Sequence, residues 1–182
     1  MIGCSEFCGC YDWTFEWLRR NFGQEAVERY WRQAISADSQ RHAAELIVSQ
    51  GVAGMMKYWG HTLAEEKAGY VTWADEQRQV MRIEMHACPS LGYNLQHGYR
   101  YYHDYCDHCM GWLLPIMERA GFVIHHDHNH RGQCWWEMRR REDPQGPSQP
   151  GELTGRHDVR LLPDYQRGNH HTWHASQLTT AP

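Results

Sequence analysis

The chain has 182 residues and a formal charge of −4, and its 22 acidic and 18 basic residues are mixed along its length. This length suits one compact domain with a tail, and the lack of a basic stripe excludes nucleic acid as an expected partner. No run of about 18 apolar residues predicts a membrane span and no secretory signal opens the chain, so we expect a cytoplasmic protein without a membrane partner.

The cysteine count points to metal or thiol chemistry. Seven is an odd number, and in a reducing compartment cysteines serve as metal ligands or reactive thiols more often than as disulfides. Cys4, Cys8 and Cys10 lie among small and polar residues. We expect residues 1–10 to form a Cys-bearing N-terminal arm that binds a metal or folds over another site.

Residues 12–69 carry apolar and aromatic side chains at three- and four-residue intervals, which predicts three or four helices. Asp12 and Asp38 are suited to begin two of them, because a short acidic side chain can cap the first turn. Core packing is the interpretation that we favour for the aromatic side chains of these helices.

Between residues 79 and 86 the period changes to two, which predicts a strand. The same alternation places His86 and Cys88 on one side, and Pro89 ends the strand because proline has no backbone N–H to donate. Helical periodicity then resumes over residues 91–105.

A second helix is predicted over residues 106–120, where Pro115 should kink it and Gly121 is placed to end it. Residues 122–129 and 133–140 then alternate as two strands of a hairpin.

After Arg141 the composition shifts to Pro, Gly, Ser and Gln, which predicts a mostly disordered tail over residues 142–182. The fold expected from these elements is α+β: a helical N-terminal half packed on a small antiparallel sheet, with Cys and His on strand ends and on a helix. Residues 11–141 form its single domain.

Cys106 and Cys109 form a Cys-x-x-Cys pair at the start of a predicted helix. Cysteines three residues apart share a helix face, and the positive end of the helix dipole stabilises thiolate over thiol. The pair is therefore either a pair of metal ligands or an activated nucleophile.

Other elements deliver soft ligands of the kind that zinc, iron or an iron–sulfur cluster takes. A closed structural site needs four ligands, whereas a catalytic site uses three and leaves one position open, and the sequence leaves both alternatives open. The metal-ligand candidates are His86, Cys88, Cys106, Cys109 and Cys134, and the four cysteines are the candidates for a closed site.

Four histidines and one aspartate stand close together on the first hairpin strand and its turn: His125, His126, Asp127, His128 and His130. Neighbouring residues of a strand face opposite ways, so about half of them can share one site. If the loop covers residues 129–132, Asp127 pairs with Cys134, and His125, Asp127, Cys134 and Trp136 lie on one face. The acid–base candidates are His86, His108, His125 and Asp127.

The cysteine pattern resembles that of the L-2-amino-thiazoline-4-carboxylic acid hydrolase family over about residues 80–140, and more distantly that of vinyl-4-reductase type domains. The likeness rests on Cys88-Pro89, Tyr105-Cys106 with Cys109, the Gly121-Phe122 strand entry, and Gly132 before Cys134 and Trp136. It implies an α+β domain with a central small-ligand pocket and a hydrolytic reaction that opens a cyclic carbon–nitrogen bond. The matching site positions are Cys88, Cys106, Cys109 and Cys134.

These observations favour a hydrolase of small molecules that acts on carbon–nitrogen bonds. A metal held by some of these cysteines would activate water or polarise the bond while a nearby His or Asp moves protons. In the thiolate variant, Cys106 or Cys109 attacks directly and a histidine is its base. The rival hypothesis is a non-enzymatic zinc or iron–sulfur module with a structural, redox or metal-sensing role.

Overall fold

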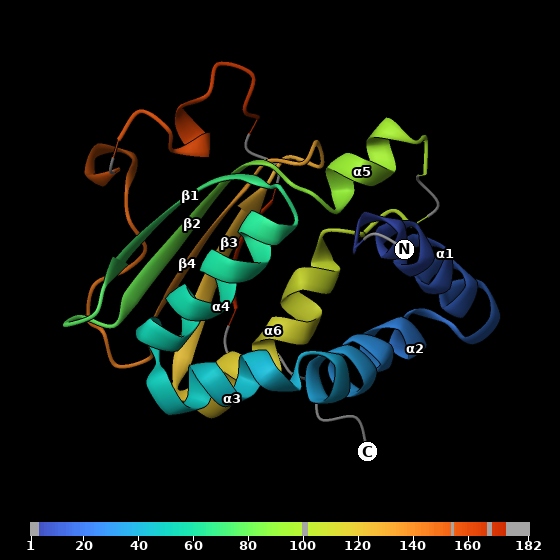
Figure 1. Ribbon diagram of the computed structural model, residues 1–182, viewed down its shortest axis with the longest axis horizontal. Helices are drawn as coiled ribbons and strands as arrows, with labels where there is room; N and C mark the ends of the chain where they lie inside the picture. Colours follow the sequence, from blue (N-terminus) through green and yellow to red (C-terminus); the bar gives the residue numbers. More distant parts are fainter. Residues whose placement is uncertain (1–3, 100–101, 154, 167–168, 174–182) are drawn as a thin grey trace.

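The computed structural model describes residues 4–99, 102–153, 155–166 and 169–173 (Figure 1). Helices make up most of the N-terminal half, as the spacing of apolar residues predicts. The helix bounds are α1 Cys4–Phe22, α2 Gln24–Arg29, the π-helix η1 Tyr30–Ser39, α3 Arg41–Gln50, α4 Val52–Glu65, α5 Leu91–Gln96 and α6 Asp107–Ala120. Two short 3-10 turns, η2 Pro150–Glu152 and η3 Val159–Leu161, follow the last helix in the C-terminal segment.

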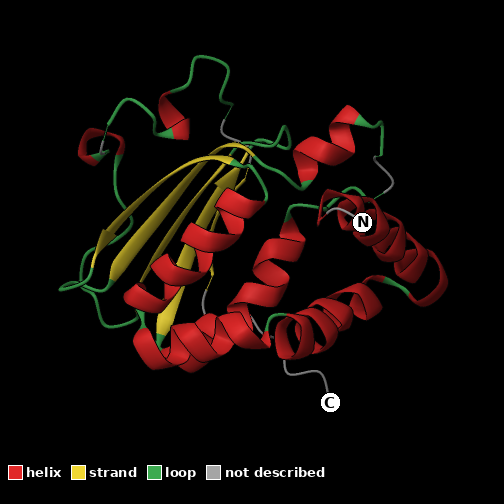
Figure 2. Ribbon diagram, in the orientation of Figure 1, coloured by secondary structure: helices red, strands yellow, loops and turns green. Residues whose placement is uncertain are grey.

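Five antiparallel strands form one sheet with the order β1-β2-β4-β3-β5 (Figure 2). Their bounds are β1 Gly69–Asp75, β2 Val80–Ala87, β3 Phe122–His128, β4 Cys134–Arg140 and β5 Asn169–Trp173. Two hairpins therefore meet edge to edge through β2 and β4. The predicted α+β class is confirmed.

Helices α4 and α6 cover one face of the sheet, which we call the inner face (Figure 1). Alternation along the strands turns apolar side chains toward it, where they join the main core. The inner-face core residues include Met81, Ile83, Met85, Ile124, Trp136 and Met138. Gly121 ends α6 in the left-handed conformation (φ 76°), as predicted, because glycine adopts it without a Cβ clash.

The opposite, outer face of the sheet is polar but also buried. The Arg82 guanidinium lies 3.1 Å from a carboxylate oxygen of Glu137, and the Arg139 guanidinium lies 3.0 Å from the other. All three side chains are at most 4 % exposed. Pairing of these charges offsets the cost of removing them from water.

The C-terminal segment lies on this outer face instead of being disordered over its described part. Asp158 and Val159 are fully buried, the Arg160 guanidinium stacks 4.0 Å from the centre of the Trp135 ring, and the Ser148 amide donates to Glu137 (3.1 Å). The segment is held by ionic and hydrogen-bonding partners, which a count of its apolar residues does not reveal. The end of the predicted tail, residues 174–182, lies outside the described residues.

The N-terminal cysteines belong to a helix and not to a separate arm, because α1 already begins at Cys4. Phe7 and Tyr11 extend the apolar spacing of the helix by one turn toward the N-terminus, and both line the central cavity. Cys8 lines the same cavity, whereas Cys10 is exposed.

The two expected N-caps also differ from prediction. Asp12 lies inside α1, where its buried carboxylate accepts a hydrogen bond from the Tyr102 amide (3.4 Å). Asp38 lies inside η1, near the end of that helix. Within the described residues, none of the helices combines the length and the apolar character that crossing a membrane requires.

Candidate active site and metal site

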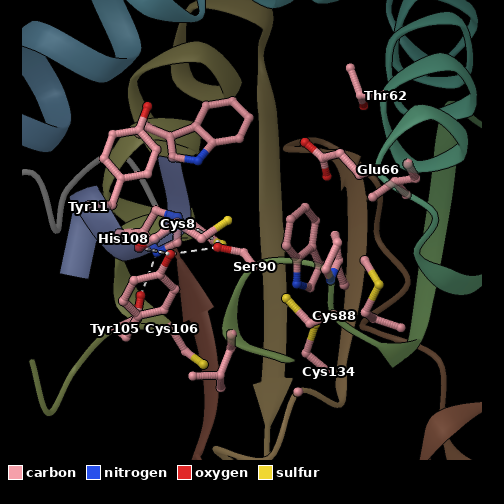
Figure 3. A pocket seen from close by; sticks show the side chains of 18 of the residues that line it. Cys8, Tyr11, Thr62, Glu66, Cys88, Ser90, Tyr105, Cys106, His108 and Cys134 are labelled. Carbon is pink, nitrogen blue, oxygen red and sulfur yellow. Dashed lines mark hydrogen bonds between the residues drawn. The ribbon is translucent and has the colours of Figure 1, made fainter. Parts of the chain in front are cut away.

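A cavity of about 450 Å³ lies between α1, α4, α6 and the inner face of the sheet (Figure 3). Small-molecule sites typically measure roughly 300–1,000 Å³, so this volume suits a compact ligand. The walls are largely apolar and include the aromatic side chains of Tyr11, Tyr58, Trp59, Trp112 and Trp136.

The four cysteines that the sequence singles out all line this cavity. Cys88 follows β2, Cys106 and Cys109 lie at the start of α6, and Cys134 is the first residue of β4. Cys8 of α1 is a fifth lining cysteine, for which the sequence predicted only a place in the arm. Elements far apart in the chain thus bring five sulfur atoms to one enclosed space.

Cys109 and His108 form a hydrogen-bonded pair, with 3.8 Å between the Cys109 sulfur and His108 Nε2. His108 Nδ1 lies 2.5 Å from the carbonyl oxygen of Tyr105. A carbonyl oxygen can only accept, so Nδ1 carries the proton of the neutral ring and Nε2 accepts from the Cys109 thiol. The Tyr105 hydroxyl is in turn hydrogen-bonded to Ser90 Oγ (2.6 Å). This is the arrangement of a nucleophile, its base and an orienting group.

Burial keeps both members of the pair uncharged at rest. It lowers the pKa of His108 to about 4, and burial together with the neighbouring Cys88 raises the pKa of the Cys109 thiol well above its ordinary value. The expected stabilisation of thiolate by the helix dipole is therefore overcome. The first amides of α6 donate to preceding carbonyls instead of to sulfur, as Cys109 N does to Cys106 O (3.3 Å).

Two further cavity thiols, those of Cys134 and Cys88, also have raised pKa values. Burial, and then the charge of Cys88, raises the pKa of Cys134. Burial likewise raises the pKa of Cys88, although backbone amides of Ser90, Leu91 and Gly92 hydrogen-bond to it and lower the pKa. A bound cation would favour their deprotonation, because an adjacent positive charge stabilises thiolate.

Cys106, His128 and His130 could hold a metal ion, since their donor atoms all lie within 4.8 Å of one another. Among the described residues, this is the one such group of His, Cys, Asp and Glu. The predicted all-cysteine quartet does not meet the same distance condition, although its members share the cavity. The carboxylate of Asp107 lies 3.9 Å from Nε2 of His128 and can orient that ring.

The predicted strand register is wrong by one residue. His128, not Asp127, pairs with Cys134, and His126 pairs with Trp136. A slip of one residue exchanges the two faces of a strand, so His126 and His128 lie on the inner face with Cys134.

Three predicted site residues lie on the outer face, His125 and Asp127 because of this slip and His86 because it shares the polar face of β2 with Arg82 and Glu84. His125 is opposite Glu137 across the ladder. Asp127 acts on the hydroxyl of Tyr165, whose pKa is raised by burial and by that carboxylate. His86 packs near His157, with 6.3 Å between ring centres. The structure does not bring these residues to the cavity cysteines.

The loop explains the slip, and a sequence signal could have corrected it. Asn129 N donates to Gln133 O (3.2 Å), so the loop proper is residues 130–132, and Gly132 has a φ of 84°. On β4, Glu137 and Arg139 mark one face as polar and thereby assign Cys134 to the other. A three-residue loop with a left-handed glycine then places His128 opposite Cys134.

Comparison with known proteins adds no relative: no family model, curated protein or solved structure matches the chain.

Proposed function

We propose that this protein is a small-molecule hydrolase that cleaves a carbon–nitrogen bond, with Cys109 as nucleophile and His108 as its base. The observation that carries the proposal is the chain of hydrogen bonds from the Cys109 sulfur through His108 to the Tyr105 carbonyl, set in the wall of a cavity of small-molecule size. The resemblance of the cysteine pattern to L-2-amino-thiazoline-4-carboxylic acid hydrolases supports carbon–nitrogen bonds as the target.

The first half of the reaction transfers the substrate carbon to sulfur. Nε2 of His108 takes the thiol proton while the Cys109 sulfur bonds to the carbon of a C=N group, whose π electrons move to nitrogen. The electron pair on that nitrogen then restores the C=N bond. At the same time the second nitrogen of the amidine group leaves with the electrons of the broken C–N bond and takes the proton from His108. The low pKa of His108 requires proton transfer and S–C bond formation to occur together.

The second half consumes one water molecule. Water loses a proton to Nε2 of His108 and bonds to the carbon that Cys109 holds, and the π electrons of the C=N bond move to its nitrogen, whose electron pair later restores the double bond as sulfur leaves. The sulfur then leaves with the electrons of the S–C bond and regains a proton from His108, which restores the neutral pair. Because the cavity walls are mainly apolar, a bound substrate excludes all but a few waters.

Cys106, His128 and His130 suit zinc, which takes sulfur and imidazole nitrogen. With three protein ligands, zinc would act as a Lewis acid toward a bound nitrogen or water. Cys106 lines the cavity, so this group adjoins the reacting pair. The same group favours a second candidate function, a zinc-binding module without turnover, in which Cys109 and His108 are packing residues.

The test compares Cys109→Ser with Cys10→Ser, which changes an exposed cysteine of α1. The assay incubates each full-length protein with 2-amino-thiazoline-4-carboxylate and with 2-aminothiazoline, and detects the product with one added water by mass spectrometry. We expect Cys10→Ser to retain turnover and Cys109→Ser to lose it. The turnover rate of His108→Asn should fall by about 10²–10⁴-fold, the range for removing a general base.

Wild-type turnover by folded Cys109→Ser would contradict the assignment of the nucleophile. Absence of turnover of either compound by the metal-loaded wild-type protein, with full metal uptake, would favour the zinc-binding module instead.

A further inference from the structure

The charge of the described cavity wall is one-sided. Among the described lining residues, Glu66 is the sole carboxylate and none is Lys or Arg. A ligand that enters this cavity therefore meets the Glu66 carboxylate beside a described wall that carries no Lys or Arg.

Three residues on one face of α4 and at its C-terminal end line the cavity, and Glu66 is the last of them. Tyr58, Thr62 and Glu66 follow one another at four-residue intervals and all line the cavity. Glu66 caps the C-terminal end of α4, where its amide donates to Thr62 O (2.9 Å). The negative end of the helix dipole adds to the charge of the carboxylate at this point. Figure 3 shows the side chain extending from α4 toward the middle of the cavity.

The aromatic walls reinforce the preference for positive charge. Trp59 and Trp136 meet edge to face, with 5.9 Å between ring centres, and Tyr58 packs on Trp59 at 5.5 Å. The faces of such rings attract cations, most strongly where water is excluded.

We infer that the cavity takes a small cationic nitrogen compound, an amidinium or guanidinium, with Glu66 as its charge partner. The inference rests on the proposed function for the reaction, and it adds the charge and class of the ligand. It also departs from the resemblance, whose substrate carries a carboxylate. Within the described wall no Lys or Arg meets that carboxylate, and Glu66 repels it.

The experiment measures binding, not turnover, by isothermal titration calorimetry with two matched compounds. 2-Aminothiazoline is an amidinium cation near neutral pH, and 2-amino-thiazoline-4-carboxylate is the same ring with a carboxylate added. Full-length Cys109→Ser protein is used so that no ligand is consumed. We expect the cation to bind at least about tenfold more tightly than the carboxylate compound.

The carboxylate of Glu66 is tested in the same background. Glu66→Gln should weaken binding of the cation by about tenfold or more, because a charge-assisted hydrogen bond is lost. Glu65→Gln, at an exposed position one residue earlier in α4, should leave affinity unchanged. Glu66→Asp keeps the charge and should retain part of the affinity even if Glu66→Gln is destabilised.

The outcomes separate this inference from the proposed function. Glu66-dependent binding of the cation without hydrolysis by the wild-type protein supports the inference and removes the proposed reaction. Any one of three results would overturn the inference, whether or not hydrolysis is observed. The carboxylate compound binds more tightly than the cation, Glu66→Gln binds the cation with the same affinity as its parent, or the cation shows no saturable binding at millimolar concentration.

Discussion

His108 is an imidazole whose environment selects one charge state and one tautomer. Its side chain packs against the rings of Phe15 (5.5 Å) and Tyr105 (4.8 Å), and burial lowers its pKa to about 4. The carbonyl that fixes its Nδ1 proton belongs to Tyr105, three residues earlier. A single buried ring thus supplies both core packing and an aligned acceptor for Cys109.

The stability of the protein should depend on pH through His108. The pKa of His108 is near 6.5 in the unfolded chain and about 4 in the folded protein. Below pH 6.5 the unfolded state therefore binds more protons, and the free energy of unfolding falls as the pH decreases toward 4. The expected loss in the free energy of unfolding is about 3 kcal/mol. Urea unfolding at pH 7 and 4.5 should show a smaller loss for His108→Asn than for the wild type, while the exposed-site control His97→Asn follows the wild type. An unchanged loss in His108→Asn would contradict the burial of a neutral ring.

At the scale of elements, β2 and η3 are joined by a buried pair of carboxyl groups. Glu84 and Asp158 are each at most 1 % exposed and hydrogen-bond one another. Burial and the Asp158 charge raise the pKa of Glu84 to about 7, whereas the Arg160 guanidinium, at 2.8 Å, holds the pKa of Asp158 below its ordinary value in spite of burial. One proton, held on Glu84, therefore links the sheet to the C-terminal segment.

Glu84→Gln should make this link independent of pH. The folded state keeps the Glu84 proton between pH 4.5, the ordinary pKa, and about 7, so the contribution of this group to stability falls as pH rises through that window. Glutamine retains a donor toward Asp158 and cannot lose it. We expect the thermal midpoint of Glu84→Gln to drop less than that of the wild type between pH 5.5 and 8. The control Glu76→Gln lies at an exposed turn, and its thermal midpoint should fall as much as that of the wild type. If the midpoint of Glu84→Gln also falls as much as that of the wild type, no proton is held on Glu84.

The elements that the sequence predicted well are those with a strong local period. The strand before Cys88, the helix after Cys106 and both hairpin strands have close to their predicted bounds. The predicted pairing across the loop was wrong because a local period does not reveal loop length. A shift of one residue places His128, and not Asp127, opposite Cys134. The long helix expected over residues 91–105 ends at Gln96. The C-terminal segment was missed because its contacts are charged, as with Arg160 and Asp158, and such pairs leave no apolar pattern.

At the scale of the whole molecule, the cavity is built where three structural units meet. Helix α1 contributes Cys8, the C-terminal end of α4 contributes Glu66, and the sheet with the segment that links its two hairpins contributes Cys88, Cys106 and Cys134. The four-cysteine pattern could be found from sequence because it needs only ligand type and spacing. The position of Glu66 could not, since it depends on how α4 lies over the sheet.

A metal ion at Cys106, His128 and His130 would tie the start of α6 to the β3–β4 hairpin, so metal should stabilise the entire fold. A ligand that binds only the folded state adds about 2.7 kcal/mol at one hundred times its Kd. We expect wild-type protein to take up about one equivalent of Zn²⁺ and its thermal midpoint to rise with Zn²⁺ concentration. Cys106→Ser and His128→Ala should lose both effects, and Cys10→Ser, at an exposed site of α1, should keep them.

Cys88→Ser discriminates between the two metal hypotheses, because it leaves the three-residue site intact but breaks a closed site of four cysteines. Loss of Zn²⁺ binding in Cys88→Ser, with binding retained in His128→Ala, would show that the four cysteines and not the Cys106–His128–His130 group hold the ion.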